Sequence, residues 1–228
     1  MRKGELKRQE MLNAAERLFC SKGYDATSVQ DILDALHASK GGFYHHFASK
    51  EDVLKLFCSQ RAERAAAFTA ENLGEVEGDM ARINAVLYGF MPLRRKEAEF
   101  IAMLLPLIER SEGRAMGMIY QDSLCESFLP LLTGEIAKAA VNGTVCPPVR
   151  GMEGVVLQIV NHFWMDAAAA ISSAVRESKR FDASSVLTSL ERYRRAAEML
   201  LDAPYGSVEM ISIQELDEIA GMLMVRME

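Results

Sequence analysis

The stretch that decides the fold is residues 27–51, which read TSVQDILDALHASKGGFYHHFASKE. Gln30 follows Thr27 at the spacing of a capping box, in which each side chain caps the other residue's backbone N–H at a helix start. An apolar helical pattern follows, and Ser39 can cap a second short helix that ends near His46. Since only a few residues separate the two helices, the stretch predicts a helix-turn-helix.

Longer helices are predicted on both sides of this motif. The preceding helix extends from about Glu5 to Lys22, and Gly23 is a natural stop after it. The following helix opens at Ser49 and extends to about Leu73. A helix of about 24 residues would span ~36 Å, which is enough to join two modules rigidly.

The rest of the chain also has helical periodicity, without the sustained alternation that is typical of strands. Pro106 and Pro130 fall inside apolar helical patterns and are expected to kink or split those helices. The last helix is amphipathic, so its apolar face is expected to pack on the bundle of its own subunit or of a partner. The helices predicted in this region cover about residues 79–91, 94–111, 116–142, 151–178, 184–202 and 213–226.

These patterns predict an all-α protein with two domains. Residues 1–48 would form a three-helix DNA-binding domain, and residues 49–228 a helical bundle. The formal net charge is −6, but residues 1–64 carry 11 Lys/Arg and 9 Asp/Glu, whereas residues 65–228 carry the other 15 Lys/Arg and 23 Asp/Glu. Contact with DNA is therefore expected in the N-terminal segment.

The second short helix carries residue types that suit contact with DNA. Lys40 supplies positive charge, and Gly41 and Gly42 let the backbone approach closely. Tyr44 and His45 can hydrogen bond to phosphate oxygens or to base edges. Helix starts offer backbone N–H groups and a favourable dipole to phosphate. The residues expected to contact phosphate at the neighbouring helix starts are Thr27, Ser28 and Lys50.

Residues 8–54 resemble, without a gap, the DNA-binding signature of the TetR family of transcriptional regulators. One departure lies in the turn, where this chain has His37 and Ala38 and the family commonly has glycine and valine. His tolerates a positive φ, so the turn is expected to be intact. The matching residues are Ala14-Ala15, Leu18-Phe19, Gly23-Tyr24, Thr27-Ser28-Val29, Asp31-Ile32, Ser39-Lys40-Gly41, Tyr44-His45-His46-Phe47 and Ser49-Lys50-Glu51.

The resemblance implies a ligand-controlled transcriptional regulator, most often a repressor in this family. It implies a homodimer, held by the helices near residues 151–178 and 184–202, that binds a palindromic operator in double-stranded DNA. The small residues at 167–174 permit close helix approach, and the resemblance favours a dimer seam there over ordinary internal packing. By the same resemblance, the recognition helix presents Ser39, Lys40, Gly41, Gly42, Tyr44 and His45, and phosphate is contacted by Thr27, Ser28 and Lys50.

A small-molecule effector is expected to bind in the C-terminal bundle. Methionine is frequent, with 14 residues, and flexible thioethers suit an adaptable cavity as well as they fill gaps in a core. His162 can line a pocket between helices or can be a core histidine. The helices are rich in Met, Leu and Phe, so the effector is expected to be largely apolar. The candidate lining residues are Met103, Met118, Phe128, His162 and Met165.

No metal, cofactor or enzymatic chemistry is expected. The four cysteines lie far apart, and His45 and His46 point about 100° apart on a helix, so neither set suits a metal ion. The chain has no His-Glu-x-x-His, no Gly-rich phosphate loop and no Gly-x-Ser-x-Gly. The first alternative is a helical-bundle enzyme. The second is a protein that binds DNA without sequence preference, and the net negative charge of the chain opposes this second alternative.

No secretion signal or membrane span is expected. Residues 1–20 alternate charged with apolar residues. The most apolar stretch, residues 155–171, is interrupted by polar side chains such as Gln158 and Asp166. Isolated cysteines suit a reducing compartment, so a cytoplasmic location is expected.

Overall fold

A computed structural model describes residues 3–108 and 114–227, and every regular element in these ranges is a helix. This confirms the all-α fold class. The predicted helix at 94–111 begins later than expected, after a 3₁₀ turn, and its predicted end lies outside the described residues. The elements are α1 (Lys3–Lys22), α2 (Val29–Ala35), α3 (Lys40–His46), α4 (Lys50–Asn72), η1 (Leu73–Glu75), α5 (Asp79–Phe90), η2 (Arg95–Glu97), α6 (Ala98–Ile108), α7 (Arg114–Val141), α8 (Glu153–Arg176), α9 (Ala183–Leu201) and α10 (Ile213–Met227).

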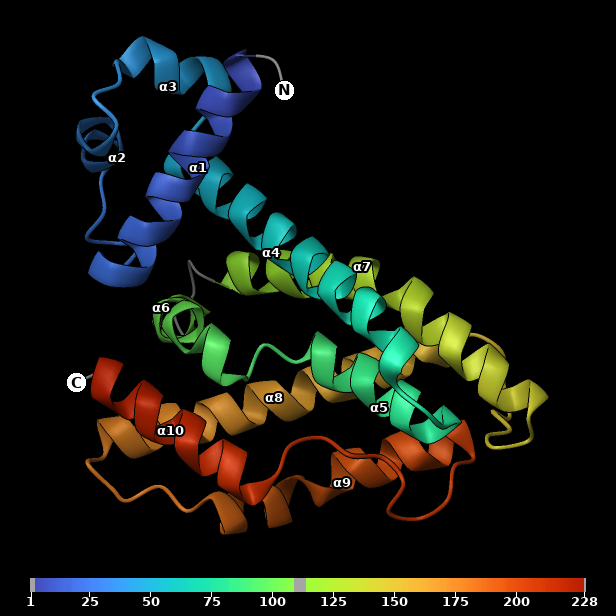
Figure 1. The fold of residues 1–228 in the computed structure, drawn as a ribbon. Helices are drawn as coiled ribbons and strands as arrows, with labels where there is room; N and C mark the ends of the chain where they lie inside the picture. Colours follow the sequence, from blue (N-terminus) through green and yellow to red (C-terminus); the bar gives the residue numbers. More distant parts are fainter. Residues whose placement is uncertain (1–2, 109–113, 228) are drawn as a thin grey trace.

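The fold consists of a small N-terminal unit and a larger bundle. α1, α2 and α3 lie at one end, and α4 extends from them into the bundle, where it packs along α7 (Figure 1). The buried side chains of both parts belong to one hydrophobic cluster, which extends from Met11 in α1 to Leu223 in α10. The small unit is therefore packed directly onto the bundle and is not tethered by α4 alone.

The start of α2 differs by one residue from the prediction. Ser28, not Thr27, is the N-cap, and Asp31, not Gln30, completes the capping box. Thr27 is fully buried, and its hydroxyl donates a hydrogen bond to the carbonyl of Gly23 (2.8 Å). The error arose because two adjacent hydroxyl residues each have a polar residue three positions later, and only the direction of the incoming chain selects between them.

The starts of α3 and α4 and the turn before α3 agree with the predictions. Ser39 and Ser49 are the N-caps, and each side chain accepts a hydrogen bond from a backbone N–H at 3.2 Å. His37 lies in the turn with φ of 50°. The N–H of Ala38 donates to the carbonyl of Leu33 (2.9 Å), which closes the turn as in a Schellman motif.

The two prolines inside helices do not divide them. α6 continues through Pro106 to its last described residue, and α7 continues through Pro130 as one helix of 28 residues. Of the two expected outcomes, a kink or a split, the split does not occur. Proline removes one N–H, which leaves the carbonyl four residues earlier without its helical partner. Pro130 and Glu126 are both exposed on α7, so water can hydrogen bond to that carbonyl.

α8 is the one described helix that is long and apolar enough to cross a membrane, and half of its most apolar window is buried inside the bundle. It packs against α7, α9 and α10. Trp164 is among its buried residues, and the indole N–H donates to the side-chain oxygen of Asn161 (3.0 Å). Burial within the bundle accounts for the apolar character of this helix.

The last helix packs on the bundle of its own subunit, which is one of the two positions that the sequence allowed. α10 contacts α6, α8 and α9 and covers one side of the bundle (Figure 1). The four residues of its apolar stripe are at most 1% exposed, and they are Leu216, Ile219, Ala220 and Leu223.

Candidate nucleic-acid interface

The third helix has one buried face and one exposed face. Phe43 is fully buried and Phe47, at the end of the helix, is 2% exposed, so both anchor α3 to the core of the small unit. The opposite face is open, and the ring of Tyr44 is 59% exposed. The exposed residues of this face are Lys40, Gly41, Tyr44 and His45.

The two glycines of α3 have different surroundings. A Cβ on Gly41 would meet no atom within 4 Å, so nothing in the free protein requires glycine there. A Cβ on Gly42 would lie 3.4 Å from Oγ of Ser39, the atom that accepts the hydrogen bond from the Gly42 N–H. Gly42 thus serves the helix cap, whereas Gly41 leaves the backbone bare on the exposed face, where a DNA backbone or base edge can approach.

The start of α2 offers less to phosphate than the sequence suggested. Ser28 is exposed, but its hydroxyl donates to Oδ2 of Asp31 (2.6 Å). Lys22 binds the other oxygen of Asp31 (2.7 Å), and this contact and the Ser28 hydrogen bonds hold the pKa of Asp31 well below its usual range. A carboxylate therefore already occupies the positive end of this helix. Thr27 is buried, so its side chain cannot reach DNA, which corrects the expectation for this residue.

Lys50 of α4 is hydrogen bonded to the loop before α2. Its ammonium donates to the carbonyls of Tyr24 (2.9 Å) and Thr27 (3.0 Å), and it lies 4.0 Å from the centre of the Tyr24 ring. An ammonium has three N–H donors, so at most one remains for a phosphate. Lys50, which the sequence predicted to contact phosphate, therefore also stabilises the packing of α4 against this loop.

Lys50→Met is expected to lower the free energy of unfolding by about 2 kcal/mol, since two charge-assisted hydrogen bonds are lost and the half-buried stem is kept. Urea denaturation measures this change. Lys55→Met, an exposed position on the same helix, is the control and should change stability by less than about 0.5 kcal/mol. Unchanged stability of Lys50→Met together with weaker DNA binding would assign Lys50 to phosphate alone.

Arg61 links the small unit to the bundle, and it was not among the residues predicted from the sequence. Its guanidinium donates to Glu16 of α1 (2.9 Å) and to Glu97 of η2 (2.6 Å). Burial by itself would lower the pKa of Arg61, but the carboxylates of Glu97 and Glu16 outweigh burial and raise the pKa above its usual value. Glu16 lies 45 positions from Arg61 in the chain and Glu97 lies 36 positions from it, so no periodic sequence pattern predicts these contacts.

The five residues predicted to line an effector cavity are not brought together. Phe128 is buried in the bundle core, whereas Met118 and His162 are exposed on α7 and α8. Met165 is partly buried, and Met103 borders a surface cavity between α1 and α6. No described cavity is lined by more than one of them. Helical periodicity shows that a side chain faces inward or outward but not which neighbours it meets.

A cavity of about 880 Å³ lies elsewhere in the bundle, between α5, α9, α10 and the segment 206–212. Asn84 of α5 holds this segment: its side chain donates to the carbonyl of Ser207 (2.9 Å) and accepts from the N–H of Glu209 (3.1 Å). The apolar side chains of the lining include Met80, Phe163, Leu187, Val208, Met210 and Ile211.

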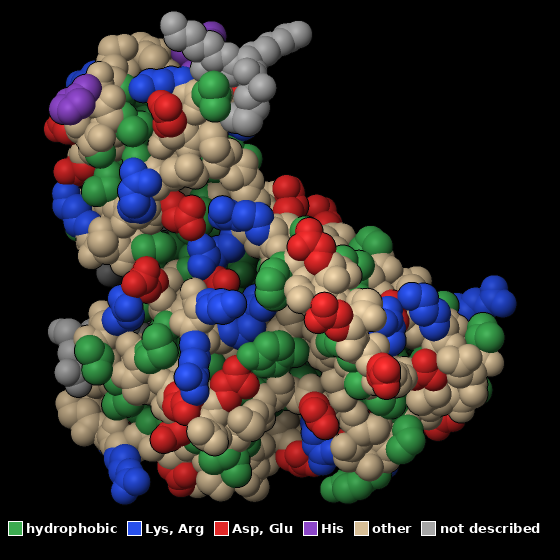
Figure 2. Space-filling view, viewed as in Figure 1, with side chains coloured by type: hydrophobic (Ala, Val, Ile, Leu, Met, Phe, Trp, Pro, Cys, Tyr) green, Lys and Arg blue, Asp and Glu red, His purple; other side chains and the backbone are tan. Residues whose placement is uncertain are grey.

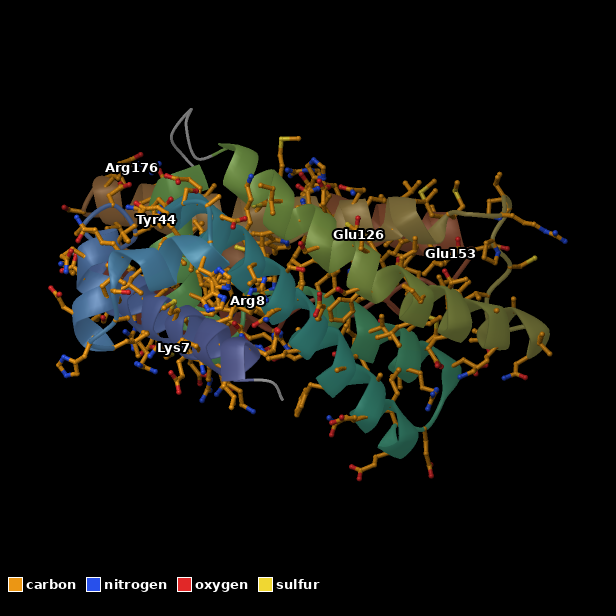
Figure 3. The ribbon with its side chains drawn as sticks, turned by 90° about the horizontal axis from the view of Figure 1, so that it is seen from above. Lys7, Arg8, Tyr44, Glu126, Glu153 and Arg176 are labelled. Atoms are coloured by element: carbon orange, nitrogen blue, oxygen red, sulfur yellow. The ribbon has the colours of Figure 1, made fainter. Side chains whose placement is uncertain are left out.

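The two parts of the chain differ in net charge, which is +2 for residues 1–64 and −8 for residues 65–228. Seen from above, Lys7, Arg8 and Tyr44 lie on the N-terminal helices, and Glu126 and Glu153 lie on the α7 and α8 part of the bundle (Figure 3). Arg8 also lies 5.6 Å from the ring of Phe47, at the end of α3. The positive charge near α3 agrees with the division between the +2 and −8 parts of the sequence.

Comparison with known proteins identifies relatives of the N-terminal part. Residues 11–56 match the family model of bacterial regulatory proteins, tetR family. The HTH-type transcriptional repressor AcnR of Corynebacterium diphtheriae is 37% identical over 76 residues, which are 33% of this chain and 40% of that repressor. The repressor KstR2 of Mycobacterium tuberculosis is 44% identical over 48 residues, 21% of this chain and 24% of its own. The chain thus aligns with less than half the length of these curated relatives.

Solved structures share the fold over most of the chain. GusR of Salmonella enterica has a TM-score of 0.57 at 20% identity, covering 89% of this chain and 99% of GusR. FadR of Bacillus subtilis, solved in complex with stearoyl-CoA, has a TM-score of 0.57 at 15% identity, covering 86% of this chain and 99% of FadR. At these identities the likeness shows the arrangement of an N-terminal helix-turn-helix and a C-terminal helical domain.

Proposed function

Because its residues 11–56 place the chain in the tetR family of bacterial regulatory proteins, we propose that it is a sequence-specific DNA-binding repressor. The repressor acts as a cytoplasmic homodimer on a palindromic operator and is released by a small, largely apolar effector. The observation that carries this proposal is the division of α3 into a buried anchor face and an open face of Lys40, Gly41, Tyr44 and His45. Such a helix can enter the major groove of DNA without any change in its own packing.

We assign DNA binding to residues 1–48 and effector binding and dimerisation to residues 49–228. α8 supports the dimer proposal, since Val155, His162 and Ala169 form an exposed stripe at intervals of seven residues. The run of small residues at 167–174 is only partly available to a partner subunit. Ala169 is exposed, whereas the side chains buried within the subunit are those of residues 167, 168, 171 and 172. Two-fold pairing along this stripe and α9 would give the two recognition helices a fixed separation.

The cavity of about 880 Å³ is the proposed effector site. Its volume lies within the range typical of small-molecule pockets. α4 couples the site to DNA, because it begins next to the recognition helix, carries Arg61 and packs along α7 and α5. A tilt of α4 that moves its end by a few Å changes the separation of the two DNA-binding units of the dimer. The coupling free energy between effector binding and DNA binding is typically ~1–3 kcal/mol in such systems.

Selection of bound DNA from a random pool tests the proposal. The expected product is a palindrome whose half-sites lie about one helical turn apart, because a two-fold dimer contacts the same groove twice. Sedimentation of the protein at micromolar concentration should give the dimer mass in parallel. A pool that shows no enrichment would support the alternative of binding without sequence preference, and an asymmetric product would contradict the dimer.

A further inference from the structure

A second cavity, of about 590 Å³, lies where the small N-terminal unit meets the bundle. Its walls come from α1, α4, α5, α10 and residues 94–97, and Lys and Arg side chains gather on the surface at this junction (Figure 2). Five of its lining side chains are cationic and three are acidic, although residues 65–228 as a whole carry an excess of acid. The charged lining residues are Arg61, Arg64, Arg94, Arg95, Lys96, Glu16, Glu97 and Glu215.

The carboxylates of this cavity already have partners. Glu16 and Glu97 both bind Arg61. Glu215 accepts a hydrogen bond from the hydroxyl of Tyr88. These contacts use the negative charges within the protein, so they leave part of the positive charge of the cavity unbalanced.

Three of the cations keep unused donors. The Nε–H of Arg94 is buried and has no hydrogen-bond acceptor among the described residues. Arg64 donates through Nε to the carbonyl of Gln60 (3.3 Å), but its Nη2 lies 3.8 Å from Glu16, beyond hydrogen-bond distance. Lys96 lies 5.6 Å from the ring centre of Phe68, which is 56% exposed and forms an apolar wall. A buried N–H without an acceptor is unfavourable, and an anionic oxygen in the cavity would supply the missing acceptor.

We propose that this cavity binds a small organic dianion, a phosphate monoester or a dicarboxylate, whose apolar part lies against Phe68. Arg95 is paired with Glu218 of α10, whereas Arg64, Arg94 and Lys96 keep donors for an anion. Guanidinium groups bind phosphate and carboxylate through paired N–H donors. The volume of the cavity is that of a small-molecule site.

The anion site is separate from the effector cavity but shares a wall with it. Tyr88 and Glu215 line both cavities. An anion held by Arg64 and Arg94 joins α4 to the segment before η2, next to the Arg61–Glu16 pair that holds α1. Occupancy of the anion site therefore bears on the position of the DNA-binding unit, and this consequence rests on the proposed function.

Isothermal titration calorimetry of the full chain with phenyl phosphate tests the site. Phenyl phosphate is expected to bind, and the neutral 2-phenylethanol is not. Arg94→Gln and Lys96→Gln should each weaken binding by about tenfold or more, because each removes a charged donor. Arg150→Gln, on an exposed loop, is the matched control and should bind as the unchanged protein does. Phenylsuccinate is titrated in the same way as the dicarboxylate probe. Whichever of the two anions binds more tightly shows whether the site prefers a phosphate monoester or a dicarboxylate.

Equal affinity of the unchanged protein and both glutamine variants would overturn the proposal, as would equal heats for phenyl phosphate and 2-phenylethanol. Lys96→Gln keeps the test decisive if Arg94→Gln fails to fold, since Lys96 is exposed. Operator affinity is measured separately by fluorescence anisotropy. Absence of specific DNA binding would contradict the proposed function, while the calorimetric result would still decide the anion site.

Discussion

Tyr44→Ala is expected to weaken operator binding about 30-fold or more without lowering the melting temperature. A side chain that contacts DNA in each of two heads loses about 1–3 kcal/mol per head when truncated, so at least about 2 kcal/mol is lost in a dimer. The ring of Tyr44 is largely exposed and touches Phe43 only edge to face (centroids 5.4 Å), so its removal leaves no cavity in the core. Fluorescence anisotropy with operator DNA and a thermal melt provide the two measurements.

Controls separate the loss of a DNA contact from a general loss of structure. Tyr205→Ala removes an exposed tyrosine far from the small unit and should leave operator binding unchanged. Lys40→Gln should also weaken binding, but it should flatten the salt dependence by about one unit per head, which Tyr44→Ala should not do. Operator binding by Tyr44→Ala within twofold of the unchanged protein would remove Tyr44 from the interface.

Glu198→Ala is expected to lower the free energy of unfolding by about 3 kcal/mol, the largest stability effect that we predict. Glu198 is fully buried and accepts hydrogen bonds from Arg194 (2.9 Å), Arg195 (3.1 Å) and the backbone N–H of Gly206 (2.8 Å). Truncation leaves the N–H of Gly206 and the guanidinium of Arg195 without this acceptor, and Arg194 keeps only its contact with Glu191. This expected loss in the free energy of unfolding lies at the low end of the range for removing one partner of a buried ion pair. The reason is that the Arg195 side chain is 46% exposed, so water can solvate it.

Melting at fixed protein concentration measures this effect, with an expected decrease of about 6–12 °C. Glu191→Ala is the matched control: it lies on the same helix and also pairs with Arg194, but it is half exposed and should cost less than about 1 kcal/mol. Glu198→Gln should lie between the two, since the amide oxygen can still accept from the Gly206 N–H. Equal melting temperatures for the two alanine variants would contradict the buried role of Glu198.

The same substitution should also loosen a wall of the proposed effector cavity. Glu198 holds the turn that leads from α9 into the segment 206–212, and Asn84 holds that segment to α5. Hydrogen exchange in this segment should therefore rise in Glu198→Ala, while exchange in α3 stays unchanged.

The sequence by itself determined most of the helical elements and which face of α3 is exposed. Local rules suffice for these features, because a cap, a turn and an apolar stripe each depend on residues within about four positions. Ser39, Ser49 and His37 were placed correctly for this reason, and so was the buried stripe of α10. The shift from Thr27 to Ser28 marks the limit of such rules when two adjacent residues satisfy them equally.

Only the tertiary structure decided which distant residues meet. The effector candidates do not meet as a set because periodicity assigns burial but not neighbours: Phe128 is buried and His162 is exposed. Lys50 carries a full charge at a helix start, yet its ammonium binds carbonyls more than twenty positions away. The two cavities and the Arg61 contacts likewise join segments separated by tens of residues, and it is the packing of whole helices that brings their side chains together.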